Sequence, residues 1–206
     1  MIKNFKELQE RVRSGKPLVV SVAQAADQEL LLSVKAAADH GFIRPVLTGN
    51  KEKIAEICGH IGLCPLEILQ ADTEEEAVEK AVREVHDGKA QVLMKGLVNT
   101  SIYMRGILNR EWGLRTGRLL SMMAVYEAPN YHKLLFCSDS GINVAPGLEQ
   151  KKDILKNLLY AVDNMGIHNP KVAVLTANEM VDSKVVSTTD AAGLVEAAMN
   201  EEGFLP

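Results

Sequence analysis

Short, almost wholly apolar runs alternate along the chain with longer stretches in which apolar residues recur at the spacing of an amphipathic helix. The apolar runs predict strands over residues 18–23, 45–49, 91–94, 119–125, 133–137 and 171–175. The helical spacing predicts helices over residues 27–41, 51–58, 73–88, 148–165 and 189–198. Because apolar runs without polar alternation are typical of strands covered on both faces, the pattern predicts an α/β protein with mainly parallel sheets flanked by helices.

Signals at the ends of the predicted elements support this division. Asp27 precedes the first of these helices, and Thr73 followed by Glu76 has the form of a capping box. The acidic run at residues 74–76 is interpreted as charge that favours a helix N-terminus, rather than as a metal site or an acid/base pair. A break at residues 128–130 divides the chain into a first α/β domain, 1–129, and a second α/β domain, 130–206.

The stretch 93–108, LMKGLVNTSIYMRGIL, carries the strongest chemical signal. It runs from a predicted strand through a Lys-Gly turn into a predicted helix, and such a junction directs unpaired N–H groups and the positive end of the helix dipole outward. Lys95 and Arg105 add positive charge, and Gly96 permits close approach of the backbone. The pattern therefore suits a phosphate group. The alternative interpretation is a surface turn, a helix N-cap and a solvated arginine.

Composition and net charge argue against nucleic acid and membranes as partners of this protein. The 206 residues carry a net charge of −4 with a pI near 5.8, whereas proteins that bind nucleic acid usually present a basic face. No apolar run approaches the roughly 18 residues that span a bilayer, and the N-terminus lacks the apolar core of a signal peptide. We therefore expect no nucleic-acid or membrane partner and a cytoplasmic location.

Several common sites are not supported by the sequence. The three cysteines lack a CxxC spacing and the five histidines are scattered, so reduced thiols and no metal site are expected. No GxGxxG follows a predicted strand, and Gly88-Lys89 is followed by Ala90. Neither an NAD-binding Rossmann site nor a P-loop is therefore predicted.

Four ordered segments resemble the phosphate acetyl/butyryltransferase family, most closely its phosphate butyryltransferase branch. They are residues 93–108, EWGLRTGRLLS (111–121), SDSGINVAPGLEQKKDIL (138–155) and PKVAVLTANEMVDSKVVSTTDAAGL (170–194). The resemblance implies two lobes with a cleft between them in an isocitrate/isopropylmalate dehydrogenase-like architecture, with the second lobe incomplete. Metal-dependent decarboxylating dehydrogenases of related architecture need clustered aspartates, and the aspartates here are isolated.

The resemblance also implies a reaction, the reversible transfer of a short-chain acyl group, butyryl or branched, between coenzyme A and inorganic phosphate. Coenzyme A is then a substrate, and no bound cofactor is expected. Members of the family usually continue beyond this length with a C-terminal segment whose Ser-Arg pair is implicated in catalysis. The alternative function is a catalytically incomplete remnant that binds phosphate and coenzyme A, or one half of a split enzyme. We expect a homo-oligomer or a complementing chain.

The family motifs suggest roles for individual residues. Phosphate or acyl phosphate would bind at Lys95, Gly96, Thr100 and Arg105. Arg115 and Arg118 would hold the phosphates of coenzyme A, or else they belong to a flexible basic loop. Asp139 and Asn143 are the catalytic candidates: Asp139 would orient a hydroxyl or accept from the pantetheine amide, and Asn143 would donate to the thioester carbonyl. Alternatively, both residues form Asx-turns that shape the loop.

Overall fold

The computed structural model describes residues 2–200 and 204, and these form two compact units. The sheet unit consists of Gln9–Thr116, and the C-terminal unit consists of Met1–Leu8 together with Gly117–Pro206. The boundary expected from the sequence, after residue 129, falls within the C-terminal unit. Helix α1, Phe5–Arg13, carries the chain from one unit into the other.

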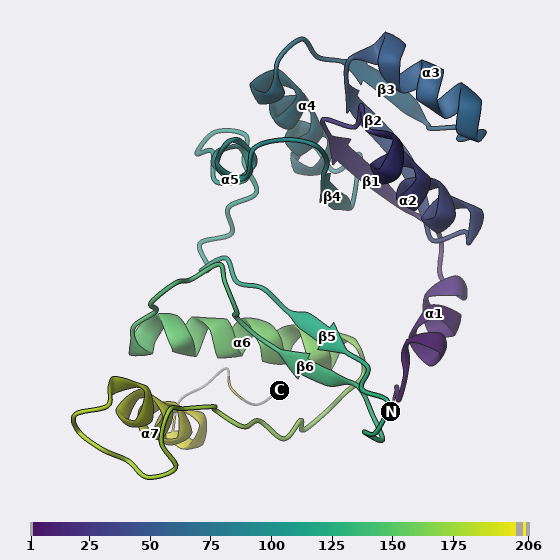
Figure 1. Ribbon diagram of the computed structural model, residues 1–206. Helices are drawn as coiled ribbons and strands as arrows, with labels where there is room; N and C mark the ends of the chain where they lie inside the picture. The colour runs from purple at the N-terminus through teal and green to yellow at the C-terminus, as the bar shows by residue number, and fades with distance from the viewer. Residues whose placement is uncertain (1, 201–203, 205–206) are drawn as a thin grey trace. The chain divides into compact units, whose positions relative to one another are not determined.

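The sheet unit is built on four parallel strands in the order β3-β2-β1-β4 (Figure 1). The strands are β1 Leu18–Ala23, β2 Ile43–Gly49, β3 Glu67–Gln70 and β4 Val92–Lys95. The helices that follow them are α2 Gln28–Asp39, α3 Lys51–Ile61, α4 Glu74–His86 and α5 Thr100–Ile107. The predicted α/β fold with a parallel sheet flanked by helices is therefore confirmed in this unit.

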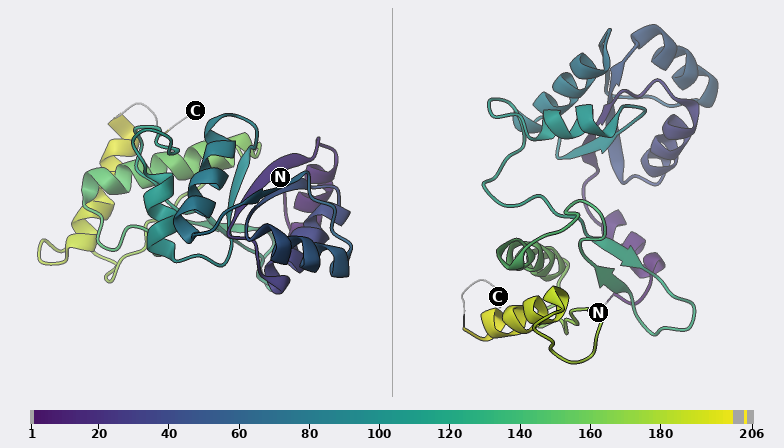
Figure 2. Two further views of the ribbon diagram at one scale, coloured as in Figure 1. Left: turned by 90° about the horizontal axis from the view of Figure 1, so that it is seen from above. Right: turned by 60° about the vertical axis from the view of Figure 1, so that its left-hand side comes forward.

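Two hydrophobic clusters cover the two faces of this sheet. On one face, Val22 and Leu47 pack with Leu31 of α2 and Ile54 of α3. On the other face, Ala23 packs with apolar residues of α4 and of the segment that leads into α5. Figure 2 shows the same sheet between its helices from two further directions. Burial on both faces explains why the two central strands, β1 and β2, are mostly apolar in sequence.

Side-chain caps begin all four helices after the sheet strands, and they place these helix starts at the carboxyl ends of the strands. Asp27, Asn50, Thr73 and Asn99 each accept a hydrogen bond from a backbone N–H in the first turn of the following helix. The predicted capping box is confirmed in its first half, because Thr73 accepts from the Glu76 N–H. The Glu76 carboxylate instead accepts from the N–H of Asp72, one residue earlier than the motif requires.

The C-terminal unit departs from the predicted parallel sheet. Its strands β5, Ala124–Tyr126, and β6, Leu135–Cys137, form an antiparallel pair, and its helices are α6, Leu148–Asn164, and α7, Val186–Asn200. The strand predicted over residues 119–125 begins only at Ala124. The reason is that the carbonyl groups of Leu119 and Leu120 accept hydrogen bonds from asparagine side chains instead of from a neighbouring strand.

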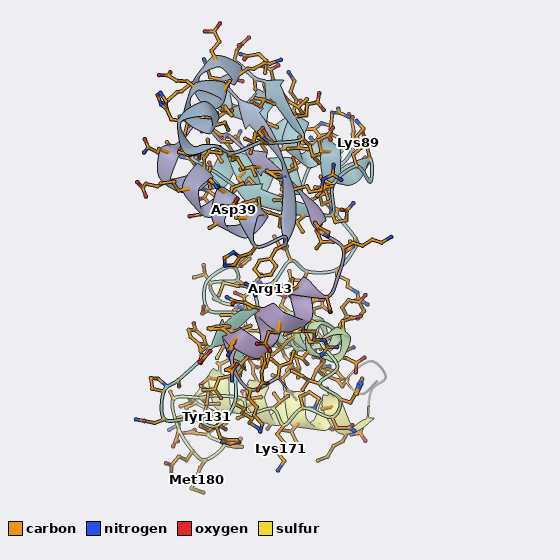
Figure 3. The ribbon with its side chains drawn as sticks, turned by 90° about the vertical axis from the view of Figure 1, so that its right-hand side faces the viewer. Arg13, Asp39, Lys89, Tyr131, Lys171 and Met180 are labelled. Atoms are coloured by element: carbon orange, nitrogen blue, oxygen red, sulfur yellow. The ribbon has the colours of Figure 1, made fainter. Side chains whose placement is uncertain are left out.

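Two further predictions in this unit are wrong. Residues 171–175, predicted as a strand, pair with no strand in the described part of the chain; Lys171 and Met180 mark this region in Figure 3. Helix α7 begins at Val186, before the caps expected at Thr189 or Asp190. The buried Thr188 hydroxyl bonds to the backbone of Asp182 and Val185, and this closed turn starts the helix earlier.

Replacement of Gly106 by alanine is expected to destabilise the sheet unit. A Cβ at this position would lie 2.3 Å from Cγ1 of the buried Val78, so α5 would have to move away from α4. Overpacking of this kind costs about 1–3 kcal/mol, more than the roughly 1 kcal/mol that alanine gains over glycine in a helix. Urea unfolding measures the change.

Gly59→Ala in α3 is the matched control, because nothing lies within 4 Å of the point that a Cβ would occupy there. We expect this variant to be as stable as the unchanged protein or more stable. A Gly106→Ala protein as stable as Gly59→Ala would contradict the close packing of α4 and α5.

Candidate functional site

The order of strands in the sheet unit marks one position for a ligand. The chain passes from β1 to β2 and β3 on one side, and β4 then adds to the other side of β1. In open parallel sheets, ligands bind outside the carboxyl ends of the strands at the point where this order reverses. Here that point lies between the end of β1 at Ala23 and the end of β4 at Lys95, which are paired in register.

Gly96 allows the loop after β4 to lie directly against the end of β1. Its N–H donates to the Ala23 carbonyl at 2.8 Å, and the Leu97 N–H donates to the Gln24 carbonyl at 3.0 Å. A Cβ on Gly96 would stand 2.4 Å from both of these carbonyl oxygens. The glycine thus permits a close approach of two backbone segments, and its own N–H is already engaged within the protein.

A pocket of about 400 Å³ opens at this edge of the sheet. It is lined by Gln24, Ala26, Asn50, Lys53, Ala71, Asp72, Glu74 and Leu97. Gln24 has a φ of 54°, in the left-handed region that non-glycine residues seldom adopt. Sequence reasoning missed Gln24 as a pocket residue, because no local motif marks it.

Lys95 ends β4, Thr100 is the first residue of α5 and Arg105 lies in the last turn of that helix, and all three are exposed. The Arg105 Nε donates to the Ser101 carbonyl at 3.4 Å, so the side chain lies back toward the first turn of the helix. Among the described residues, no carboxylate lies within ion-pair distance of Lys95 or Arg105. The Lys95 Nζ lies 3.4 Å from the Gly96 carbonyl oxygen, so within the described part of the chain both cations bond only to backbone carbonyl groups and keep their charge unneutralised.

Glu74 of α4 also reaches this helix start. Its Oε2 accepts from the Asn99 N–H at 3.1 Å, and the Asn99 side chain in turn accepts from the Ser101 N–H at 2.9 Å. A protein carboxylate thus already lies at the positive end of the α5 dipole, where an anionic ligand would be stabilised. Sequence reasoning treated Glu74 only as favourable charge for its own helix and missed this contact, which joins residues 25 positions apart.

In the C-terminal unit, the Asp139 carboxylate closes the turn that follows β6. Its Oδ1 accepts from the N–H groups of Gly141, Ile142 and Asn143 at 3.1, 2.8 and 3.4 Å, and its Oδ2 accepts from the Asn143 side chain at 2.5 Å. Burial raises the pKa of Asp139, but the hydrogen bonds from the Asn143 side chain and the three backbone N–H groups outweigh it and leave the pKa lowered. This geometry favours the Asx-turn interpretation.

The segment after Gly117 is fixed by side chains from two other parts of the same unit. The Asn143 Nδ2 donates to the Leu120 carbonyl at 3.0 Å. The Asn157 Nδ2 donates to the Leu119 carbonyl at 2.8 Å and lies 3.0 Å from the Ser121 hydroxyl. Asn157 was missed by sequence reasoning, because contacts across more than 35 residues leave no local pattern.

The two arginines predicted for coenzyme A fall in different units. Arg115 belongs to the sheet unit and is exposed, and Arg118 belongs to the C-terminal unit. The guanidinium carbon of Arg118 lies 5.4 Å from the centroid of the Tyr160 ring on α6. Asp139 and Asn143 lie in the same unit as Arg118 and are joined to its loop through Leu120.

Comparison with known proteins settles the family. A family model described as phosphate acetyl/butaryl transferase matches residues 55–203. The chain belongs to this family. The resemblance drawn from the four sequence motifs is thereby confirmed for the phosphate acetyl/butaryl transferase family.

Individual relatives in the phosphate acetyl/butaryl transferase family agree with this. A probable phosphate butyryltransferase of Bacillus subtilis (strain 168) is 39% identical over 93% of this chain and 64% of its own length. A phosphate butyryltransferase of Clostridium acetobutylicum is 40% identical over 98% of this chain and 67% of its own length. The chain thus spans about two thirds of the length of these relatives.

A solved structure supports the fold. A branched-chain phosphotransacylase from Enterococcus faecalis V583 superposes with a TM-score of 0.76 at 23% identity, over 91% of this chain and 66% of that one. Within the described residues, no helix is long and apolar enough to cross a membrane. No group of three or more His, Cys, Asp or Glu side chains in this part of the chain is arranged to hold a metal ion.

Replacement of Glu74 by glutamine is expected to strengthen phosphate binding at the α5 N-terminus. Glutamine keeps an acceptor for the Asn99 N–H but removes the negative charge that a phosphate would meet there. Charge effects at a helix terminus amount to about 0.3–1 kcal/mol, or about a two- to fivefold fall in the dissociation constant of phosphate. Isothermal titration calorimetry with inorganic phosphate measures it.

Glu75→Gln is the matched control, because the neighbouring residue also lies in the first turn of α4 but is exposed. It removes the same charge from the N-terminus of α4. Equal effects of the two substitutions would show that Glu74 acts through overall charge rather than through its position at α5.

Proposed function

We propose that this chain catalyses reversible transfer of a short-chain acyl group, butyryl or branched, between coenzyme A and inorganic phosphate, giving an acyl phosphate. The proposal is supported by the family, and by two relatives whose names are phosphate butyryltransferase. The observation that carries it is the pair Lys95, at the switch point of the sheet, and Arg105, in the helix that follows. These cations have no carboxylate partner among the described residues, so their charge remains available to an anionic substrate.

The chemistry requires positioning and charge stabilisation more than a strong base. A phosphate oxygen attacks the thioester carbonyl, a C–O bond forms, and negative charge develops on the carbonyl oxygen. The C–S bond then breaks, and the sulfur leaves with the electron pair as a thiolate, which takes a proton from solvent. In the reverse direction the thiolate attacks the acyl phosphate and phosphate leaves. No covalent enzyme intermediate is needed.

The phosphate site in this proposal is the β4–α5 loop. Lys95 and Arg105 supply positive charge, and Arg105 can present two parallel N–H groups to phosphate oxygens. Thr100 opens α5, and its N–H and hydroxyl make no hydrogen bond to other residues in the part of the chain that is described. Gly96 contributes by setting the path of the loop rather than by donating its N–H.

Coenzyme A phosphates are assigned to Arg115 and Arg118. Both hydrogens of the Asn143 side-chain amide have acceptors in the protein, the Leu120 carbonyl and the Asp139 carboxylate. We therefore assign Asp139 and Asn143 to positioning of the loop that carries Arg118. A direct donation from Asn143 to the thioester carbonyl would require one of these hydrogen bonds to break.

The first experiment measures release of free thiol from butyryl-CoA by the purified chain, with and without phosphate. We expect phosphate-dependent release, and we expect Arg105→Ala to lower kcat/KM at least about tenfold, the loss typical of a charge-assisted hydrogen bond. Arg110→Ala is the matched control, because Arg110 is exposed and follows the end of α5.

Different results would point to different functions. Binding of coenzyme A without thiol release would favour the non-catalytic binding module or one half of a split enzyme. Phosphate-dependent release that is equally reduced by Arg105→Ala and Arg110→Ala would move the phosphate site away from the α5 N-terminus.

We further propose a cytoplasmic location, an isocitrate/isopropylmalate dehydrogenase-like architecture, and association with a second copy or a complementing chain. Association is supported by large apolar side chains on the C-terminal unit, where Leu175, Met180 and Val181 are 90%, 77% and 67% exposed. Apolar surface on this scale is typical of an interface. We expect light scattering to report a dimer or larger species, and a monomer at high concentration would contradict self-association.

A further inference from the structure

We propose that one face of α6, formed by Asn157 and Tyr160, holds Arg118 ready to bind a phosphate group of coenzyme A. This inference rests on the proposed function and names two residues of the C-terminal unit that the sequence motifs did not. Asn157 and Tyr160 are positioning residues, because they act through the loop and the guanidinium group of Arg118.

Tyr160 orients the charge of Arg118 without neutralising it. The guanidinium carbon lies 5.4 Å from the ring centroid, within the range of a cation–π contact. Among the described residues, no carboxylate lies within ion-pair distance of Arg118. An arginine that stacks on an aromatic ring keeps the N–H groups at its edge, and these match the oxygens of a phosphate.

Asn157 fixes the backbone directly after this arginine. Its side-chain amide donates to the Leu119 carbonyl at 2.8 Å and lies 3.0 Å from the Ser121 hydroxyl. Asn157 and Tyr160 are three residues apart on α6, so their side chains are neighbours on one helix face. The same rigid helix therefore holds both the main chain and the side-chain tip of the Arg118 loop.

The loop receives a third restraint from Asn143, in the turn that follows β6. Asn143 donates to the Leu120 carbonyl at 3.0 Å, and Asp139 fixes Asn143 in turn. Three successive residues after Arg118 are thus bound by asparagine side chains. A loop restrained in this way binds a ligand with less loss of conformational freedom than a mobile basic loop.

Coenzyme A is the phosphate ligand that this position favours. In the proposed function the β4–α5 loop binds inorganic phosphate, whereas coenzyme A carries a diphosphate and a 3′-phosphate that also need cations. Arg118 can bind one of these groups, either the diphosphate or the 3′-phosphate. Both are phosphate anions, so analogues of coenzyme A that lack one of them are needed to distinguish the two.

The test compares Tyr160→Leu with Tyr160→Phe by calorimetric titration of coenzyme A into the full chain. Tyr160 is 63% exposed, so both variants should fold, and circular dichroism checks this. Loss of the ring should raise the dissociation constant of coenzyme A about two- to fivefold, the range of an exposed cation–π contact. Phenylalanine retains the ring face and should restore binding.

A double-mutant cycle with Arg118→Ala connects the effect to the arginine. In the Arg118→Ala background, Tyr160→Leu should change binding no further, and pantetheine, which has no phosphate, should bind all variants equally. If Tyr160→Leu does not weaken binding of 3′-dephospho-CoA, Arg118 binds the 3′-phosphate. If it weakens that binding as much as binding of coenzyme A, Arg118 binds the diphosphate. In steady-state assays, Tyr160→Leu should raise KM for butyryl-CoA and leave kcat and KM for phosphate unchanged.

Three results would overturn the inference. The first is that Tyr160→Leu and Tyr160→Phe weaken coenzyme A binding equally. The second is that Tyr160→Leu weakens binding just as much in the Arg118→Ala background. The third is that the unchanged chain does not bind coenzyme A. Failure of the proposed function is a separate observation, the absence of phosphate-dependent thiol release while coenzyme A still binds.

Discussion

The close packing of Gly96 against the carbonyl oxygens of Ala23 and Gln24 is the contact on which the sheet unit's candidate site depends. Two backbone hydrogen bonds hold the loop there, and a Cβ would stand 2.4 Å from both oxygens. Any side chain larger than hydrogen would lift the loop off the end of β1. The start of α5 would move with it, and Arg105 of α5 would shift relative to Lys95 at the end of β4.

Thr48 secures the other side of the same edge. It is fully buried in β2, its hydroxyl lies within hydrogen-bond distance of the carbonyl oxygens of Val22 and Ala77, and it accepts from the Gln24 N–H at 3.3 Å. The hydroxyl therefore connects the end of β1 to α4. Because Glu74 lies in the first turn of that helix, the restraint also determines how near its carboxylate comes to α5.

The elements that could be predicted from sequence are those specified by neighbouring residues. Strand β1 is an apolar run because it is buried on both faces, and the caps at Asp27 and Thr73 are defined within three residues. The loop at Gly96 was predictable for the same reason. The prediction placed the start of the strand at residue 119, too early, because the side chains of Asn143 and Asn157 donate hydrogen bonds to the carbonyl groups of Leu120 and Leu119. These partners lie 23 and 38 residues away in the sequence. Apolar composition cannot reveal such partners.

The two units thus position Arg105 and Arg118 by different kinds of interaction. In the sheet unit, backbone packing at a strand end sets where α5, the helix that carries Arg105, begins, and the Glu74 carboxylate accepts a hydrogen bond at that helix start. In the C-terminal unit, Leu119 and Leu120 pair with no strand among the residues that the structure describes, and side-chain amides donate to their carbonyl groups instead. Side-chain amides can donate hydrogen bonds to the carbonyl groups of a curved segment that could not pair with a strand, because each side chain adjusts its own direction. A loop held in this way can follow the shape that Arg118 needs while the carbonyl groups of Leu119 and Leu120 keep their hydrogen bonds, which explains why an apolar sequence here does not become a strand.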